Sequence, residues 1–269
     1  MNLKDRVAVV TGAGSGIGRA LALSLARRGC HLALADINPQ SLAETVELAQ
    51  AAGVRVSSHP LDVTDHAAVA ALPAAVQAAH QRVDLVINNA GVALGGTFEQ
   101  VSAADFDWLF NVNFHSVVQM TRAFLPELHR SDDARLVNIS SIYGLIAPPG
   151  QSAYSASKFA VRGFSNVLRQ ELAGTTVGVT VVHPGGVATA IARSARLPAG
   201  SDPEQTTKQL ARISKLLRMP PEQAGELIVR GIEQRKARIL VGTDAKLAAL
   251  LERLLPVSYM NVLQKLVRR

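Results

Sequence analysis

Seven short apolar runs alternate with helical patterns along the chain, and this alternation constrains the fold more than any other feature. The apolar runs cover residues 6–11, 31–36, 54–59, 83–91, 134–141, 176–186 and 238–242. Helical spacing is present at 18–29, from Pro39, from about Asp65, from Ser102, at 151–173 and at 221–235. Such alternation predicts an α/β fold with a doubly wound parallel sheet of about seven strands and helices on both faces. Ligands of such sheets bind beyond the carboxyl ends of the strands, where we expect the functional residues.

The size and composition are typical of one globular domain. One hydrophobic core can support 269 residues, so we expect residues 1–269 to form a single domain. Hydrophobic residues make up 48% and charged residues 18%, which excludes the composition of a disordered chain. The single cysteine excludes an internal disulfide, and the seven histidines lack metal-ligand spacing, so no metal site is expected. No leader pattern precedes the first apolar run, so we expect a cytoplasmic protein.

The net charge of +7 is unevenly distributed. Residues 1–189 contain 13 basic and 14 acidic residues, whereas residues 190–269 contain 15 basic and 7 acidic residues. The excess positive charge therefore belongs to the last 80 residues and needs its own explanation. Aromatic residues are few and no basic recognition motif is present, so nucleic-acid binding is not expected.

A glycine-rich turn follows the first apolar run. The segment TGAGSGIG places Gly12, Gly16 and Gly18 at TGxxxGxG spacing, with Ser15 and Ile17 between them. Such a turn lets the backbone approach a pyrophosphate, and the N-terminus of the helix that follows supplies N–H donors. The turn is therefore a candidate dinucleotide-binding site, although strand–helix packing alone is the alternative explanation of its glycines.

Two carboxylates follow the second and third apolar runs. Asp36 lies 18 residues after Gly18, where a carboxylate accepts both ribose hydroxyls of an adenosine and repels a 2′-phosphate. Arg19 is the nearby cation and should point away from this position, so we expect NAD rather than NADP as the cofactor. Asp62 would accept from the adenine amino group, beside the Val63 backbone. The alternative role for either carboxylate is at the N-terminus of the next helix.

The fourth run ends in NNAG, where Asn89, Ala90 and Gly91 combine small side chains with backbone donors. This composition is suited to a sheet edge on which a cofactor lies. Asn-rich turns are also common without any ligand.

Tyr154 and Lys158 lie four residues apart in AYSASKFA, on one face of the predicted helix 151–173. A free tyrosine has a pKa of about 10, which is poorly matched to proton transfer at neutral pH. The Lys158 ammonium, together with the positive ring of an oxidised nicotinamide, would lower the pKa of this phenol. Tyr154 would then take a proton from an alcohol while a hydride leaves the alcohol carbon. The alternative is an ordinary pair of neighbours on a helix surface.

Taken together, these motifs resemble the short-chain dehydrogenase/reductase family up to about residue 242. The motifs occur in family order: TGxxxGxG at 11–18, NNAG at 88–91, Asn113 in NVN, Ser141, Tyr154 with Lys158, and PGxVxT from Pro184 to Thr189. Ser141 lies 13 residues before Tyr154, the separation that the family typically uses. The resemblance implies a Rossmann-type fold and an oxidoreductase that acts on alcohols or ketones.

The resemblance also implies roles for the remaining residues. Ser141 would hydrogen-bond the substrate oxygen, Lys158 would bind the nicotinamide ribose, and Asn113 would hold a water that links Lys158 to solvent. The carboxamide of the nicotinamide would be held by the turn after the sixth run, at Pro184, Gly185, Val187 and Thr189. Dimers and tetramers are common in the family, so a homodimer or homotetramer is expected.

Two further segments bear on the substrate and on partners. Residues 193–220 occupy the place of the family's substrate lid, and apolar spacing from Leu210 to Met219 predicts an amphipathic helix. This helix either covers an apolar substrate or packs on the protein. Residues 243–269 form a C-terminal helical tail with two apolar stripes separated by Pro256. We expect the tail to pack against a partner subunit, and its alternatives are covering the substrate pocket or contacting an anionic membrane surface.

We therefore predict an NAD-dependent oxidoreductase that interconverts a secondary alcohol and a ketone on a steroid-like, acyl or lipid-like substrate. One alternative is a reductase of 3-oxoacyl thioesters, whose phosphate-bearing carrier would suit the basic tail. The other alternative is a nucleotide-sensing protein on the same fold, without catalytic activity.

Overall fold

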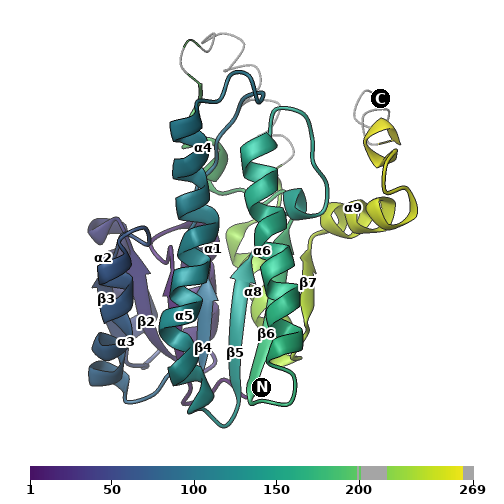
Figure 1. Ribbon diagram of the computed structural model, residues 1–269. Helices are drawn as coiled ribbons and strands as arrows, with labels where there is room; N and C mark the ends of the chain where they lie inside the picture. The colour runs from purple at the N-terminus through teal and green to yellow at the C-terminus, as the bar shows by residue number, and fades with distance from the viewer. Residues whose placement is uncertain (199, 201–216, 263–269) are drawn as a thin grey trace.

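One sheet of seven parallel strands forms the centre of the protein (Figure 1). The computed structural model describes residues 1–198, 200 and 217–262. The strands are β1 (Val7–Thr11), β2 (His31–Asp36), β3 (Val56–Pro60), β4 (Leu85–Asn88), β5 (Ala134–Ile139), β6 (Val177–Pro184) and β7 (Arg238–Val241). Their order in the sheet is β3–β2–β1–β4–β5–β6–β7, so the direction of winding reverses between β1 and β4. Each of the seven predicted runs is thus a strand of a doubly wound, Rossmann-type sheet.

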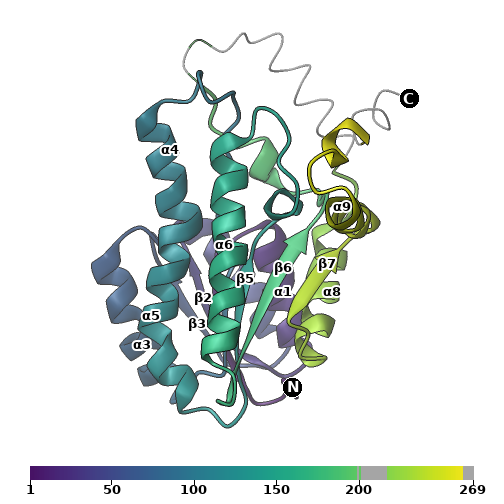
Figure 2. The ribbon, with the colours of Figure 1, turned by 45° about the vertical axis from the view of Figure 1, so that its right-hand side comes forward.

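Helices cover both faces of this sheet, as predicted. They are α1 (Gly16–Ala26), α2 (Pro39–Gln50), α3 (His66–His80), α4 (Ala103–Phe110), α5 (Ser116–His129), α6 (Ser152–Glu171), α8 (Pro221–Glu233) and α9 (Thr243–Leu254), with short helices η1 (Asn111–His115), η2 (Ile142–Gly144) and η3 (Ala190–Ala192). Figure 2 shows α5 and α6 in front of the sheet and α1 and α8 behind it. Alternate residues of β1 serve the two cores: Ala8 and Val10 pack on the α1 and α8 side, Val7 and Val9 on the α5 and α6 side. None of the helices in the described part of the chain is both long and apolar enough to cross a membrane.

Side-chain caps begin three helices where the sequence predicted a start. Asn38, Asp65 and Ser102 each accept backbone N–H bonds from the first turn of α2, α3 and α4. The long helix expected from Ser102 is interrupted, however, because the π-helical turn η1 separates α4 from α5. Such turns re-aim side chains and are frequent at functional sites, and this one contains Asn113.

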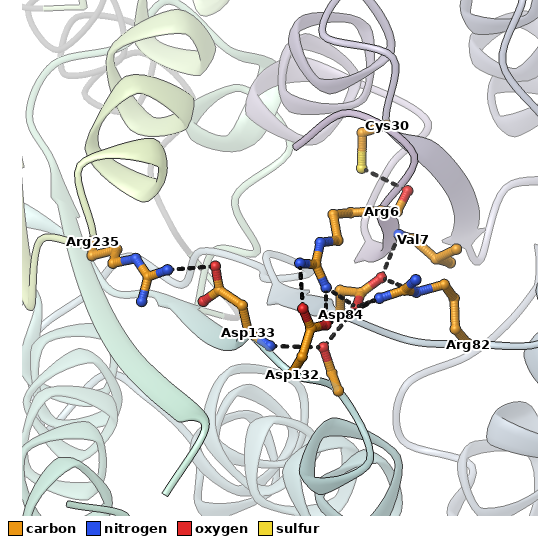
Figure 3. Close-up of polar contacts among 9 residues, drawn as sticks. Arg6, Val7, Cys30, Arg82, Asp84, Asp132, Asp133 and Arg235 are labelled. Atoms are coloured by element: carbon orange, nitrogen blue, oxygen red, sulfur yellow. Dashed lines mark hydrogen bonds and ion pairs between the residues drawn. The ribbon is translucent and has the colours of Figure 1, made fainter. Parts of the chain in front are cut away.

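The amino ends of the strands are tied together around a buried carboxylate, that of Asp84 (Figure 3). Asp84 accepts hydrogen bonds from Arg6 at 3.0 Å, Arg82 at 2.6 Å, the Ser131 hydroxyl at 2.6 Å and the Val7 N–H at 2.9 Å. Burial alone would raise the pKa of Asp84, but these hydrogen bonds outweigh it and hold the pKa below its usual range. The network lies at the edge of the sheet opposite the predicted functional edge, so it can hold the strands without obstructing a ligand.

We expect Asp84→Asn to lower the free energy of unfolding by about 3 kcal/mol, because it removes the buried charge from two guanidinium groups. Asp132→Asn is the matched control: Asp132 also pairs with Arg6, but its side chain is 73% exposed, so a much smaller loss is expected. Urea titrations at neutral pH measure both losses, and equal losses would contradict the role given to Asp84.

The depressed folded-state pKa of Asp84 also predicts a pH dependence of stability. The stabilisation by Asp84 is present above the usual carboxyl pKa and disappears as the pH falls through the folded-state pKa.

Candidate active site

Three glycines shape the turn between β1 and α1. Gly12 and Gly16 have φ angles of 64° and 53°, which residues with a side chain rarely adopt. A Cβ on Gly18 would lie 1.9 Å from the Gly12 carbonyl oxygen, so the helix can approach the loop only at a glycine. Ser15 is exposed at the N-cap, and Ile17 packs on the core below. The turn therefore presents backbone and a helix N-terminus, an arrangement that suits a pyrophosphate.

The NNAG loop after β4 lies directly against this turn. Asn89 Nδ2 donates to the carbonyls of Thr11 and Gly12 at 2.9 and 3.1 Å. The Thr11 hydroxyl accepts from the N–H groups of Asn89 and Ala90 at 3.0 and 3.1 Å. A Cβ on Gly12 would lie only 2.9 Å from the Ala90 Cα. Two motifs separated by 78 residues are thus joined into one surface.

Asp36 lies beside the same turn, at the carboxyl end of β2. Its Oδ2 accepts from the Gly14 N–H at 2.8 Å, and its Oδ1 accepts from the Asn38 N–H at 2.9 Å. A Cβ on Gly14 would lie 3.0 Å from the Asp36 carboxyl carbon. The backbone therefore holds a half-buried negative charge in a defined place next to the glycine turn.

Arg19 does not point away from this region, contrary to the prediction. Its guanidinium donates to the carbonyls of Gly14 at 2.7 Å and Ser41 at 3.2 Å, and it forms an ion pair with Glu44 at 2.7 Å. The side chain is long enough to span from α1 to α2, and the open glycine loop leaves the Gly14 carbonyl within its reach. Glu44 balances the positive charge of Arg19.

Asp62, after β3, is exposed and accepts from the N–H and the hydroxyl of Thr64, both at 2.8 Å. It does not cap the next helix, because Asp65 makes the capping bonds of α3. Val63 is buried in the core on the α3 side of the sheet. The capping role considered for Asp62 is thus excluded, and its carboxylate remains accessible at the edge where ligands bind.

Tyr154 and Lys158 lie one turn apart on α6, close to the carboxyl end of β5. Ser141 follows β5, and its hydroxyl lies near the Tyr154 phenol. The same hydroxyl accepts from the Tyr143 N–H at 3.1 Å. Lys158 is buried, its Nζ donates to the Ile139 carbonyl at 3.2 Å, and this Nζ lies 5.8 Å from the centre of the Tyr154 ring. The structure therefore brings Ser141, Tyr154 and Lys158 together.

In the protein by itself, the pKa of Tyr154 is raised rather than lowered. Burial raises the pKa of this phenol to about 12, and the hydrogen bond with Ser141 opposes the rise only in part. Burial also lowers the pKa of Lys158 to about 8. The prediction that Lys158 and an oxidised nicotinamide together lower the pKa of this phenol concerns the cofactor-bound protein and stays a prediction. In the protein alone, Tyr154 is therefore a weaker acid than a free tyrosine.

Asn113 is fully buried in η1 and fastens the NNAG loop to α6. Its Oδ1 accepts from the Val92 N–H at 2.8 Å, while its Nδ2 donates to the Val92 carbonyl at 3.0 Å and to the Ser157 hydroxyl at 3.3 Å. A Cβ on Gly91 would lie 3.2 Å from Asn113 Oδ1 and 3.4 Å from Lys158 Nζ. The glycine of NNAG thus leaves the space in which Asn113 approaches Lys158.

The turn after β6 closes the site on its far side. β6 ends at Pro184, and the N–H of the next residue, Gly185, donates to the carbonyl of Val241 at the end of β7 at 2.9 Å. Val187 is buried. A Cβ on Gly16 would lie 3.1 Å from the methyl carbon of Thr189, so this turn reaches the glycine turn between β1 and α1.

His183 positions the Ser141 backbone, a role that the sequence did not reveal. Its ring is fully buried, and Nδ1 lies 2.9 Å from the Ser141 carbonyl. Because a carbonyl only accepts, Nδ1 carries the proton. Burial lowers the pKa of His183 to about 4, so the ring is neutral at physiological pH. The signal in the sequence for this role was a histidine inside the uncharged run of β6. Because Val182 pairs with Ile139, the next residue, His183, lies beside the end of β5.

The expected substrate lid is described only at its two ends. Residues 210–216, most of the predicted amphipathic helix, lie outside the described residues. At the start of the lid, Arg196 forms a short β-bridge with Leu94. The Arg196 guanidinium lies 3.7 Å from the centre of the Trp108 ring and pairs with Asp105 at 2.8 Å. The beginning of the lid is therefore attached to the loop after β4 and to α4.

The C-terminal tail contacts a loop of the site. Ala248 of α9 packs with Leu145 and Ile146, which follow Ser141 in the chain. The Tyr259 hydroxyl accepts from the Ala147 N–H at 3.0 Å. On the outer side of α9, large apolar side chains are exposed at Leu247, Leu250 and Leu254. The second apolar stripe of the tail falls almost entirely within residues 263–269, outside the described residues.

Comparison with known proteins agrees with this geometry. The family model for short chain dehydrogenase matches residues 6–199. The chain belongs to the short-chain dehydrogenase family. The protein SadH of Mycobacterium tuberculosis is 46% identical to this chain over 263 residues, covering 97% of this chain and 95% of SadH. The molecule is therefore an oxidoreductase of this family, as the resemblance implied.

Solved structures of related short-chain dehydrogenases contain either of two nicotinamide cofactors. A short-chain dehydrogenase/reductase from Burkholderia phymatum, in complex with NAD, superposes with a TM-score of 0.86 at 34% identity and 94% coverage of each chain. A metagenomic short-chain oxidoreductase in complex with NADP has a TM-score of 0.72 at 29% identity, with 90% of this chain and 98% of that chain covered. The choice of cofactor in this short-chain dehydrogenase therefore has to be argued from its own residues.

Proposed function

We propose that this short-chain dehydrogenase uses NAD to interconvert a secondary alcohol and a ketone, with Asn113, Ser141, Tyr154 and Lys158 as catalytic residues. The observation that carries the proposal is the meeting of Ser141, Tyr154 and Lys158 at the carboxyl edge of the sheet. A phenol and a hydroxyl within reach of each other can bind one substrate oxygen together. The glycine turn beside them supports a dinucleotide as the redox partner.

The cradle at this edge fits a nicotinamide dinucleotide. The close contacts at Gly12 and Gly18 leave a side-chain-free surface at the N-terminus of α1 for the pyrophosphate. Asp36 would accept the hydroxyls of the adenosine ribose, and Asp62 would accept from the adenine amino group beside Val63.

The nicotinamide half would lie across the loops that meet near Tyr154. The NNAG loop and the turn after β6 would line this half, and the residues involved are Asn89, Ala90, Gly91, Pro184, Gly185, Val187 and Thr189. Tyr154 and Lys158 would hold the hydroxyls of the nicotinamide ribose. The bound nicotinamide supplies or accepts the hydride of the reaction.

The chain's own residues orient the substrate and move the proton. Ser141 donates a hydrogen bond to the substrate oxygen and holds it beside Tyr154. In oxidation, Tyr154 Oη would take the hydroxyl proton of the substrate, and the bound cofactor would accept the hydride from the carbinol carbon. In reduction, Tyr154 returns a proton to the carbonyl oxygen. The phenol can act as a base only after its pKa has fallen, and the positive charge of the oxidised cofactor beside a desolvated phenol favours that change.

The surroundings of Tyr154 support an apolar substrate. Tyr154 packs at the edge of a hydrophobic cluster built around Leu94 and Leu109, which also includes Phe106 and Phe110. The Tyr143 ring meets the Tyr154 ring edge-on, with 6.0 Å between their centres. A carbon skeleton whose oxygen is bound by Tyr154 would lie against these side chains, which favours steroid-like, acyl or lipid-like compounds.

Two contacts favour NAD over NADP. The Asp36 carboxylate stands beside the glycine turn, where it would repel a 2′-phosphate. Arg19, which could offset that repulsion, already donates to Gly14 and pairs with Glu44. A 2′-phosphate would therefore have to displace an existing ion pair before it gained a cationic partner.

We expect Asp36→Asn to reduce the ratio of kcat/KM with NAD to kcat/KM with NADP by about tenfold or more, because one repulsive charge is removed. Asp62→Asn is the matched control and should leave this ratio nearly unchanged. Steady-state rates with both cofactors give the ratios. A wild-type enzyme that turns over faster with NADP than with NAD would contradict the cofactor proposal.

We expect Tyr154→Phe to lower kcat by about 1,000-fold or more while NADH binding is retained, because only the proton donor and acceptor is lost. Tyr143→Phe removes the hydroxyl of the adjacent ring and should retain turnover within about threefold. The measurement uses a panel of secondary alcohols, steroids and 3-hydroxyacyl thioesters with fluorescence titration of NADH. Near-wild-type turnover by Tyr154→Phe would refute its role, and no turnover of any compound by the wild type would favour a nucleotide sensor.

A further inference from the structure

The carboxylate of Asp244, in the first turn of α9, sits on the turn that follows β6. Its Oδ2 accepts a hydrogen bond from the Gly186 N–H at 2.6 Å. A Cβ on Gly185 would lie 2.2 Å from Asp244 Oδ1, and a Cβ on Gly242 would lie 2.3 Å from the same oxygen. Two glycines thus provide the space that the carboxylate occupies, and a third provides its hydrogen-bond donor.

The same turn is held from its other side by the chain that enters α8. The Gly186 carbonyl accepts from the N–H groups of Arg218 at 3.0 Å and Met219 at 3.1 Å. The Ala188 N–H in turn donates to the Met219 carbonyl at 2.8 Å. These bonds fix one face of the turn, and Asp244 fixes the other. Without Asp244, the Gly186 N–H would lose its partner, whereas the Gly185 N–H would still donate to the Val241 carbonyl.

Packing and electrostatics keep the Asp244 carboxylate in place although the residue itself is exposed. Ala245 and Ala248 of the same helix are buried, and Tyr259 bonds to the loop after Ser141, so α9 is anchored to the body of the protein. A carboxylate in the first turn of a helix is also favoured by the helix dipole. Because its acceptor is ionised, the bond to Gly186 is of the stronger, charge-assisted kind.

We propose that Asp244 is a positioning residue for the nicotinamide end of the bound cofactor. It acts through the Gly185–Gly186 turn, which leads directly into Val187 and Thr189. The inference rests on the proposed function, since it assumes that these two residues hold the carboxamide. It gives the C-terminal tail a role within the active site of its own chain.

The two halves of the cofactor allow a direct test. ADP-ribose has the adenine and pyrophosphate groups of NADH but lacks the nicotinamide, so its binding does not depend on the carboxamide turn. We expect Asp244→Ala to raise the Kd of NADH about tenfold or more, as loss of a charge-assisted hydrogen bond implies, while the Kd of ADP-ribose stays within about twofold. Asp244→Asn keeps an acceptor oxygen and should recover part of the NADH affinity. Isothermal titration of the full-length protein gives all of these values.

Glu252→Ala is the control, because it removes a carboxylate from the same helix without a contact to the turn, and it should leave both Kd values unchanged. Equal weakening of NADH and ADP-ribose by Asp244→Ala would show a general structural role and overturn the inference. Unchanged NADH affinity would also overturn it, and either result would leave the proposed function intact. A wild-type protein that binds ADP-ribose but not NADH would refute the proposed function and the inference together.

Discussion

The burial of Lys158 is the constraint on which the site depends. Its ammonium donates to the end of β5 and lies close to the space left by Gly91, where Asn113 approaches it. A charged amine that is shielded from water needs polar groups held in place around it. The end of β5, the NNAG loop and η1 therefore all lie beside Lys158. The same desolvation keeps the pKa of Lys158 low and that of Tyr154 high. The protein alone therefore holds the phenol in its protonated form at neutral pH.

The sequence predicts the sheet and the order of its motifs well, because both depend on local patterns. Periodicity identifies the seven strands, and caps such as Asn38 and Asp65 mark the helix starts. The resemblance to the family implies Ser141, Tyr154 and Lys158 as site residues, and they lie together in the structure because the carboxyl ends of parallel strands meet at one edge. These features need no knowledge of solvent exposure or of contacts between distant segments.

Solvent exposure and contacts between distant segments could not be predicted from the sequence. Helical spacing places Lys158 on the face of Tyr154, but it does not show that both side chains are desolvated in the protein alone. Helical spacing alone directs Arg19 away from the glycine turn, but the Gly14 carbonyl and Glu44 bind its guanidinium beside that turn. The bond of Asp244 to Gly186 spans 58 residues and has no local signal. Its contribution becomes visible only when the tail is seen beside the turn after β6.

The central claim is that an oxidised cofactor converts Tyr154 from a weak acid into a base. The most direct measurement is an NMR pH titration of protein labelled with carbon-13 at the tyrosine ring carbon that bears the hydroxyl. The chain has only three tyrosines, so Tyr154→Phe assigns the signal of interest. With NAD bound, the pKa of Tyr154 should fall well below its cofactor-free value of about 12, toward the range in which the enzyme works. An identical titration of this signal with and without NAD would contradict the claim.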